Sequence, residues 1–363
     1  MEETDKIKSA LQNAKNIALF VNNNPDSDAI GSVLAVFFSL KKIGKKPFLV
    51  NPAPLKSINA LIQRLTEEKL VLSFAGDVSE IFYEKNEKQT NIYLTPKTEN
   101  VAPENFFCKA VSSKEDLLTT GDLPFDLLIT LGANDYAKIE ENFTGNPDAL
   151  YQCDIINIDN NLSNQNYGDI NVIKDNPCLS QTVACLINDL GVEYMNKKTA
   201  SSLIFGLVNS PKNTRNKNNM KTLLWLLKNR GDFSLLPDYQ KSGTGTKIKL
   251  LEAALKNLDA GALKNFEVYI SSLSKNDFLT ARGNIKDLAF VADRAKNFFQ
   301  LPSFFLLWEQ NNDINGLFFS NNTALINKIK THFTGQYKES GGLLTVPADG
   351  LEKAKTAIIA VLP

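Results

Sequence analysis

The sequence predicts an α/β protein, with an N-terminal parallel sheet covered by helices on both faces and a smaller C-terminal α/β domain. Short, continuous apolar runs alternate with segments whose apolar residues recur at helical spacing. The length of 363 residues, with 43% apolar and 22% charged residues, favours about two domains. A turn-rich stretch at 231–246 separates two such alternating regions and is expected to be a linker.

The N-terminal domain, expected at 1–230, begins with a strand, a helix and a second strand. Ile17 to Val21 is a continuous apolar run, typical of a buried strand. Ala29 to Ile43 has apolar residues at helical spacing and stops before a glycine, and Asp28 stands where an N-cap belongs. Pro47 to Val50 is the next expected strand.

Two more apolar runs, Asp126 to Leu131 and Asp154 to Ile158, are typical of strands in the middle of a parallel sheet. Helices are expected to follow at Leu179 to Leu190, Ala200 to Leu207 and Lys221 to Lys228. The polar region 75–123, with one expected strand at Asn91 to Leu94, is interpreted as an insertion on the sheet rather than a domain.

The second domain is expected at 247–363, with a cleft between it and the first. Its expected strands are Phe266 to Ser271, Ser303 to Trp308 and Asn315 to Ser320. Its expected helices are Asn284 to Phe299, Thr323 to His332 and Gly350 to Val361.

Charge and hydropathy exclude several classes of protein. Forty basic and forty acidic side chains give a formal net charge of zero, so no whole-molecule field draws the chain to nucleic acid or to an anionic membrane. No uninterrupted apolar run reaches the roughly 18 residues of a membrane-spanning helix. The N-terminal residues are acidic and polar, unlike a signal peptide. We therefore expect a cytoplasmic protein with no membrane partner.

The most informative stretch is Val21 to Ser32, where two aspartates, Asp26 and Asp28, follow the first strand. A second stretch, Asn157 to Asn164, contains Asp159-Asn160-Asn161 directly after another strand. In open α/β sheets, ligands bind at the carboxyl ends of the strands. Acidic residues are also common in the turns at these ends, and a helix-capping aspartate needs no metal.

These stretches, together with Tyr167 to Asn171, resemble the motifs of DHH phosphoesterases that carry a C-terminal DHH-associated domain, among them small oligoribonucleases and phosphoadenosine-phosphate phosphatases. The resemblance spans nearly the whole chain. It implies a DHH-like domain at 1–230 and a DHH-associated domain at 247–363. It also implies hydrolysis of phosphate esters by two metal ions, usually manganese.

Four positions depart from the ligand set that the resemblance implies. Asn22 and Asn160 stand where the family has metal-binding histidines, Gly132 stands where it has the aspartate that bridges both metals, and Ser210 stands where it has a later aspartate. Two divalent cations repel each other and are held together by shared anionic ligands. Without the bridging aspartate, the repulsion between the two cations is not offset, so the chain is less able to bind a pair of metal ions.

The resemblance also implies a set of substrate-binding positions. Asn160 and Asn161 replace the two histidines of the DHH motif. In the second domain, a Gly-Gly-His loop that would hold substrate phosphate aligns with Phe333 to Gly342, with Gln336 at the histidine position. The expected substrate-binding residues are Asn160, Asn161, Gln336, Gly341 and Gly342.

Three hypotheses follow from these residues. The favoured one is a degenerate DHH phosphoesterase-like protein, with no cofactor and without two-manganese hydrolysis, that binds a nucleotide, a short RNA or a protein partner in the interdomain cleft. The first alternative is an active phosphodiesterase or phosphatase with oxygen-rich coordination, in which a single magnesium or manganese ion is held by the remaining carboxylates, Asp26, Asp28 and Asp159. The second alternative is a non-catalytic structural interaction protein.

Overall fold

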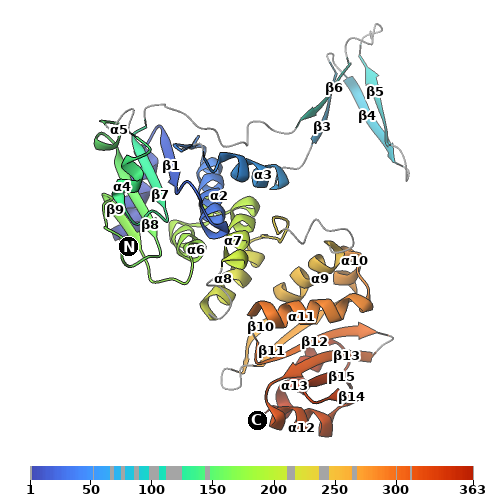
Figure 1. The fold of residues 1–363 in the computed structure, drawn as a ribbon. Coiled ribbons are helices and arrows are strands. Elements are labelled where there is room, and N and C mark those ends of the chain that lie inside the picture. Colours follow the sequence, from blue (N-terminus) through green and yellow to red (C-terminus); the bar gives the residue numbers. More distant parts are fainter. Residues whose placement is uncertain are drawn as a thin grey trace. The chain divides into compact units, whose positions relative to one another are not determined.

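The computed structural model describes most of the chain, and Figure 1 shows its course. The described residues are 2–51, 53–65, 69–74, 78–85, 90–97, 106–111, 125–143, 148–210, 217–236, 245–263, 268–299, 301–310 and 313–362. The chain divides into two compact units. One comprises Met1–Ile58 and Leu118–Pro363, and the other comprises Asn59–Leu117.

The first sheet has five parallel strands in the order β2-β1-β7-β8-β9. Their bounds are β1 Ile17–Val21, β2 Phe48–Leu49, β7 Leu127–Leu131, β8 Asp154–Asp159 and β9 Ile170–Ile173. All residues of β1 and β7 are buried, as expected for strands covered on both faces. The predicted parallel sheet is confirmed, and its four predicted strands lie where the apolar runs placed them.

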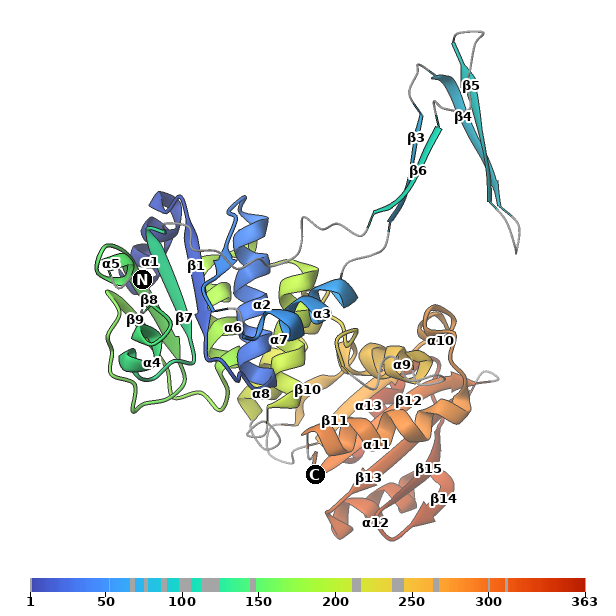
Figure 2. The same ribbon diagram turned by 45° about the horizontal axis from the view of Figure 1, so that its top comes forward.

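One face of this sheet is covered by helices α1 Glu2–Asn13, α2 Ser27–Lys42 and α6 Leu179–Leu190. Helix α7 Lys197–Asn209 lies beside α2 and α6 in both views (Figures 1 and 2), and α8 Lys217–Lys228 packs on α7. Helices α2 and α7 approach at two glycines. A Cβ atom built on Gly31 would lie 2.7 Å from the Cα atom of Gly206, so a side chain there would push the helices apart.

The opposite face is covered by two short helices, α4 Tyr136–Glu140 and α5 Asp148–Tyr151. Their side chains join an apolar cluster with alternate residues of the strands: Ala18, Phe20, Phe48, Leu128, Ala133, Ile139, Phe143, Leu150 and Ile155. Neighbouring strand residues such as Ile129 and Ile156 face the other helices instead. The prediction of helices on both faces is therefore confirmed.

The unit Asn59–Leu117 contains most of helix α3 Leu55–Leu65 and two separate antiparallel pairs of strands. Strand β3 Lys69–Phe74 pairs with β6 Phe106–Val111, and β4 Val78–Lys85 pairs with β5 Thr90–Pro96. The strand expected at Asn91 to Leu94 lies within β5. In the described part of the chain these strands pair only with one another. The interpretation of 75–123 as an insertion on the sheet stays a prediction. Helix α3 Leu55–Leu65 begins just before this unit.

The C-terminal sheet has the order β10-β11-β12-β13-β15-β14. Its strands are β10 Asp259–Leu263, β11 Val268–Leu273, β12 Ser303–Gln310, β13 Asp313–Ser320, β14 Thr334–Lys338 and β15 Gly341–Val346. Helices α9 Gly245–Lys256 and α11 Leu288–Phe299 lie on one face, and α12 Thr323–His332 and α13 Leu351–Val361 on the other (Figure 1). A short helix, α10 Lys275–Ala281, follows β11. The predicted α/β domain is confirmed.

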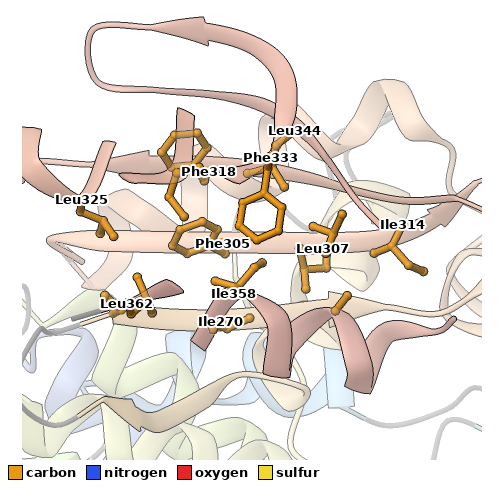
Figure 3. Packing of buried hydrophobic residues seen from close by; sticks show 14 of the residues in the cluster. Ile270, Phe305, Leu307, Ile314, Phe318, Leu325, Phe333, Leu344, Ile358 and Leu362 are labelled. Carbon is orange, nitrogen blue, oxygen red and sulfur yellow. The ribbon is translucent and has the colours of Figure 1, made fainter. Parts of the chain in front are cut away.

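The core of this domain lies between the sheet and helices α12 and α13. Figure 3 shows Phe305 and Phe318 on neighbouring strands, and their rings stack with centroids 5.3 Å apart. Ile358 of α13 and Leu325 of α12 close the cluster from the helical side. Strand β12 is apolar and buried on both of its sides, and Phe305 and Leu307 are the residues that join this cluster.

Part of the expected linker 231–246 is packed into the fold. Phe233, Leu235 and Leu236 are buried, and α9 already begins at Gly245. Residues 237–244 of this stretch lie outside the described residues. Among the helices that the structure describes, none is long and apolar enough to cross a membrane.

Candidate functional site

The first motif lies where β1 leads into α2. Asp26, not Asp28, is the N-cap of α2, because its Oδ1 atom accepts the backbone N–H of Ala29 at 2.8 Å. The predicted capping role of Asp28 is therefore wrong. Since the helix begins at Ser27, two residues before the predicted start, Asp28 lies inside the first turn and its side chain is free to reach another element.

Asp28 instead caps helix α6. Its Oδ2 atom accepts the backbone N–H of Leu179 at 2.7 Å, and its Oδ1 atom accepts the backbone N–H of Ser180 at 2.8 Å. The residue at the N-cap of α6, Cys178, makes no side-chain capping hydrogen bond of its own. Burial raises the pKa of Asp28, and the hydrogen bonds from Ser180 and Leu179 act in the opposite direction. Asp28, only 7% exposed, thus joins α2 to the positive end of α6.

Asp159 ends strand β8 and is 3% exposed. Its Oδ1 atom accepts the backbone N–H groups of Asn160 at 2.7 Å and Asn161 at 3.2 Å, as in an Asx turn. Its Oδ2 atom accepts the side-chain amide of Asn164 at 2.8 Å. Both oxygens of this carboxylate are therefore bonded to donors within the same loop.

A network of side-chain amides adjoins Asp159, in which Asn157 and Asn164 are buried and Asn171 is half-buried. Asn157 Nδ2 donates to Asn164 Oδ1 at 2.7 Å and to Asn171 Oδ1 at 3.0 Å. Asn164 Nδ2 also donates to the carbonyl of Ala133 at 3.2 Å, which accepts the hydroxyl of Tyr167 at 2.7 Å as well. We did not predict this network from the sequence, although its three asparagines lie within or beside the two motif flanks. The recurrence of asparagines in both motif flanks is the signal that could have indicated it.

The two asparagines at expected histidine positions donate hydrogen bonds to the backbone. Asn22 Nδ2 donates to the carbonyl of Gly132 at 3.0 Å, which joins the ends of β1 and β7. Asn160 Nδ2 donates to the carbonyl of Asn176 at 3.1 Å, in the loop before α6. At both positions the asparagine side chain donates an N–H to a carbonyl oxygen. A histidine that binds a metal would instead direct a nitrogen lone pair at the cation.

The two remaining departures have local structural roles. Gly132 has a φ angle of +66°, and a Cβ atom built on it would lie 3.1 Å from Leu179 Cδ2. A left-handed backbone here favours glycine over a β-carbon-bearing residue. Ser210 is the buried C-cap residue of α7. Neither residue places an anion at the carboxyl ends of the strands.

The donor set at these positions does not fit a pair of divalent cations. The bridging position has no side chain, and the oxygens of Asp28 and Asp159 already accept hydrogen bonds. Within the described ranges, which include all three candidate aspartates, no group of three or more His, Cys, Asp or Glu side chains is arranged to hold a metal ion. The alternative of a single ion on Asp26, Asp28 and Asp159 stays a prediction.

The expected phosphate loop of the second domain is a β-hairpin. Gln336 lies exposed on the edge strand β14, while Gly341 and Gly342 begin β15. Tyr337 pairs with Gly342, and a Cβ atom on Gly341 would lie 2.2 Å from the carbonyl oxygen of Phe318 on β13. The two glycines therefore allow β15 to lie close to its neighbours, which is why the segment is a strand rather than an open loop. A substrate-binding role for these three residues stays a prediction.

No protein-family model matches the chain. No curated protein matches it either. Among solved structures, it is similar to an exopolyphosphatase-related protein from Bacteroides fragilis, at 16% identity and a TM-score of 0.43, over 99% of this chain and 95% of that chain. It is also similar to a family II inorganic pyrophosphatase, described as putative, from Methanococcus jannaschii, at 11% identity and a TM-score of 0.32, over 95% and 99% of the two chains.

A third similar structure is RecJ in complex with Mn2+ from Thermus thermophilus, at 11% identity and a TM-score of 0.24, over 99% of this chain and 54% of that chain. Likenesses this distant carry no argument about activity. The function is therefore inferred from the residues of the chain itself.

Proposed function

We propose that this protein is a degenerate DHH phosphoesterase-like protein that does not catalyse two-manganese hydrolysis. It binds a nucleotide or a short RNA in the crevice expected at the carboxyl ends of β1, β7 and β8. One observation carries the proposal. The carboxylates of Asp28 and Asp159 accept hydrogen bonds from backbone and amide N–H groups with both of their oxygens.

A metal ion at either aspartate would share the carboxylate with these donors, since a carboxylate has about four lone-pair sites. It would draw charge from the hydrogen bonds that hold the start of α6 at Asp28 and the turn of Asn160 and Asn161 at Asp159. Hydrogen bonds to a charged group contribute about 1.5–3 kcal/mol each, so weakening them opposes metal binding. The carboxylates are thus better suited to holding the loops than to holding cations.

Electrostatic repulsion opposes a metal pair further. Two divalent ions about 4 Å apart repel with roughly 16 kcal/mol at an effective dielectric constant of about 20, four times the value for unit charges. In two-metal sites a shared anion compensates this repulsion. Gly132, at the position of the expected bridge, offers no anion. This set of side chains preserves the loops at the strand ends but lacks the bridging carboxylate that a pair of catalytic metal ions requires.

The proposed ligand rests on the sequence resemblance and on the polar side chains that remain. The first motif and both flanks of the second are kept around Asp26 and Asp159, where the resembling proteins bind phosphate esters. Asn160 and Asn161 add amide groups at the same strand ends. Amides donate and accept hydrogen bonds without a metal, which suits the recognition of a sugar or base edge.

The proposal is tested by a hydrolysis assay with short oligoribonucleotides, cyclic dinucleotides and phosphoadenosine phosphate, each with manganese and with magnesium. We expect no turnover above the buffer rate. A fluorescence anisotropy titration with a labelled short oligoribonucleotide, without metal, should show saturable binding. Metal-dependent turnover that is lost in both Asp28→Ala and Asn160→Ala would contradict the proposal. Asn160→Ala is included because it leaves the α6 cap intact.

A further inference from the structure

A polar cavity lies away from the carboxyl ends of the strands. It has a volume of about 530 Å³ and is lined by residues from the start of α7, the end of α8, the turn that follows α8, and α9: Lys197, Leu227, Lys228, Arg230, Asp232, Glu252 and Lys256. Lys197 begins α7, whereas Ser210, at an expected metal-ligand position, ends it. A helix of 13 residues is about 20 Å long, so the cavity is separate from the crevice.

Nearly all residues that line this cavity are ionisable. Of the described residues that line it, four are cationic, two are carboxylates and Leu227 is apolar. None of these described residues is aromatic, so they offer no surface on which a nucleobase would stack. Its character is that of a polar anion site rather than of an apolar ligand pocket.

The two carboxylates are already engaged by the protein. Asp232 pairs with Lys197 Nζ at 2.9 Å and accepts the hydroxyl of Ser201 at 3.0 Å. Burial acts to raise the pKa of Asp232, but hydrogen bonds from Ser234 and Lys197 outweigh it and the pKa is lowered. Asp232 is therefore an anion that compensates Lys197. It does not compensate the other three cations of the cavity.

Glu252 is the second carboxylate, and its Oε1 atom accepts the backbone N–H of Phe233 at 2.7 Å. It is 9% exposed, and burial raises its pKa to about 7, although the hydrogen bond from Phe233 acts to lower it. Asp232 raises this pKa further, while Lys256 and Lys197 lower it. Near neutral pH this carboxylate is thus only partly charged, and the positive excess of the cavity grows as the pH falls.

The remaining cations have little compensation. In the described ranges, Lys228 and Arg230 form no ion pair, and Lys256 interacts with Glu252 only through longer-range electrostatics. Arg230 also has a left-handed backbone, with a φ angle of +67°, in the turn that ends α8. Glycine is the usual residue at such a turn, and a non-glycine residue there costs about 1 kcal/mol. The arginine at this position therefore adds backbone strain that a glycine would avoid.

We propose that this cavity binds a small anion with two or more phosphate groups, of which pyrophosphate is the simplest. Three uncompensated cations match the charge of such a ligand, and the arginine fork suits phosphate oxygens. The volume lies within the range of about 300–1,000 Å³ that is usual for small-molecule sites. Because the described part of the lining has no aromatic side chain for a base, affinity is expected to follow the number of phosphates. This proposal does not depend on the function proposed for the crevice.

The test is isothermal titration of the full chain with pyrophosphate at low ionic strength. We expect saturable binding of one pyrophosphate per chain, weakened about tenfold by Arg230→Gly and by Lys228→Gln. Arg230→Gly suits the left-handed turn, so the variant keeps its fold. The matched control is Lys221→Gln, which removes an exposed lysine of α8 that does not line the cavity. Its affinity should equal that of the unchanged protein.

The number of phosphates and the charge of Glu252 should both affect binding. Adenosine monophosphate, with one phosphate, should bind at least tenfold more weakly than pyrophosphate. Glu252→Gln should tighten pyrophosphate binding above pH 7 and leave it unchanged well below pH 7, since only the ionised glutamate repels the ligand. Absence of saturable binding, equal loss in Lys221→Gln, or equal affinity for the monophosphate would each overturn the proposal.

Discussion

The carboxylate of Asp28 accepts the backbone N–H of Ser180 at 2.8 Å, across 152 positions of the sequence. This contact makes a residue of α2 the cap of α6. We expect Asp28→Ala to lower the free energy of unfolding by about 2–4 kcal/mol, because two buried N–H groups lose a charged acceptor. Urea denaturation without added metal measures this loss.

Asp26→Ala is the control for this prediction, since Asp26 caps α2 through a single, exposed hydrogen bond. Its expected loss is about 1 kcal/mol. If Asp28→Ala is as stable as the unchanged protein without metal and differs from it only when manganese is present, Asp28 is a metal ligand and the capping role is wrong.

The amide of Asn164 donates to Asp159, and a second carboxylate at this position would face the first. We expect Asn164→Asp to lower the free energy of unfolding by about 3 kcal/mol at neutral pH, because a buried donor is replaced by a like charge. Part of the loss should be recovered in acid, where one of the two carboxylates is protonated. The measurement is urea denaturation at neutral and at acidic pH.

Asn161→Asp makes the same chemical change in the same loop, at an exposed residue. The Oδ1 atom of Asn161 accepts the backbone N–H of Ser163, and an aspartate keeps this bond. We expect a change of less than about 0.5 kcal/mol. Equal losses in the two variants would show that the network behind Asp159 does not stabilise the loop.

Glu252 should make stability depend on pH. Burial raises its pKa to about 7 in the folded chain, against 4.5 as the ordinary value. The folded protein therefore holds this proton more tightly than the unfolded chain. The stabilisation that results is complete below the unfolded pKa and is lost as the pH rises through the folded pKa. The loss is at most about 3 kcal/mol.

Glu252→Gln removes this dependence and keeps an oxygen that accepts the N–H of Phe233. We expect the variant to be more stable than the unchanged protein by about 1–3 kcal/mol at one pH unit above the folded pKa, and equally stable in acid. Glu352→Gln, at an exposed glutamate of α13, should show no such difference between the two conditions. Urea denaturation across the pH range checks both variants.

The sequence predicted elements best where apolar runs had clear ends. The bounds of Ile17–Val21, Leu179–Leu190 and Thr323–His332 agree with the structure. Each of these segments is either a continuous apolar run or a stretch with apolar residues at helical spacing, and residues typical of turns or helix caps lie next to it. Helix α1, by contrast, was not predicted, because its many charged residues hide the narrow apolar stripe formed by Ile7 and Leu11.

The candidate site was predicted less well than the fold, for a physical reason. The motifs placed Asp159 at the end of a strand and Asp28 at the start of a helix, but the hydrogen-bond partner of Asp28 is set by tertiary structure. The partner of Asp28 is the start of α6, more than 150 residues away. The hairpin that carries Gln336 was expected to be a loop, because its glycines suggested a turn. In the structure these glycines let β15 pack closely against its neighbouring strands.

The central claim is that the oxygens at the strand ends serve the protein rather than a metal pair. Isothermal titration with manganese tests it most directly, on the unchanged chain and on a variant that combines Asn22→His, Gly132→Asp, Asn160→His and Ser210→Asp. We expect no saturable manganese binding by the unchanged chain and clear binding by the variant. The aspartate at position 132 adds backbone strain, and urea denaturation of the variant measures its cost. Saturable binding of two manganese ions by the unchanged chain would contradict the claim.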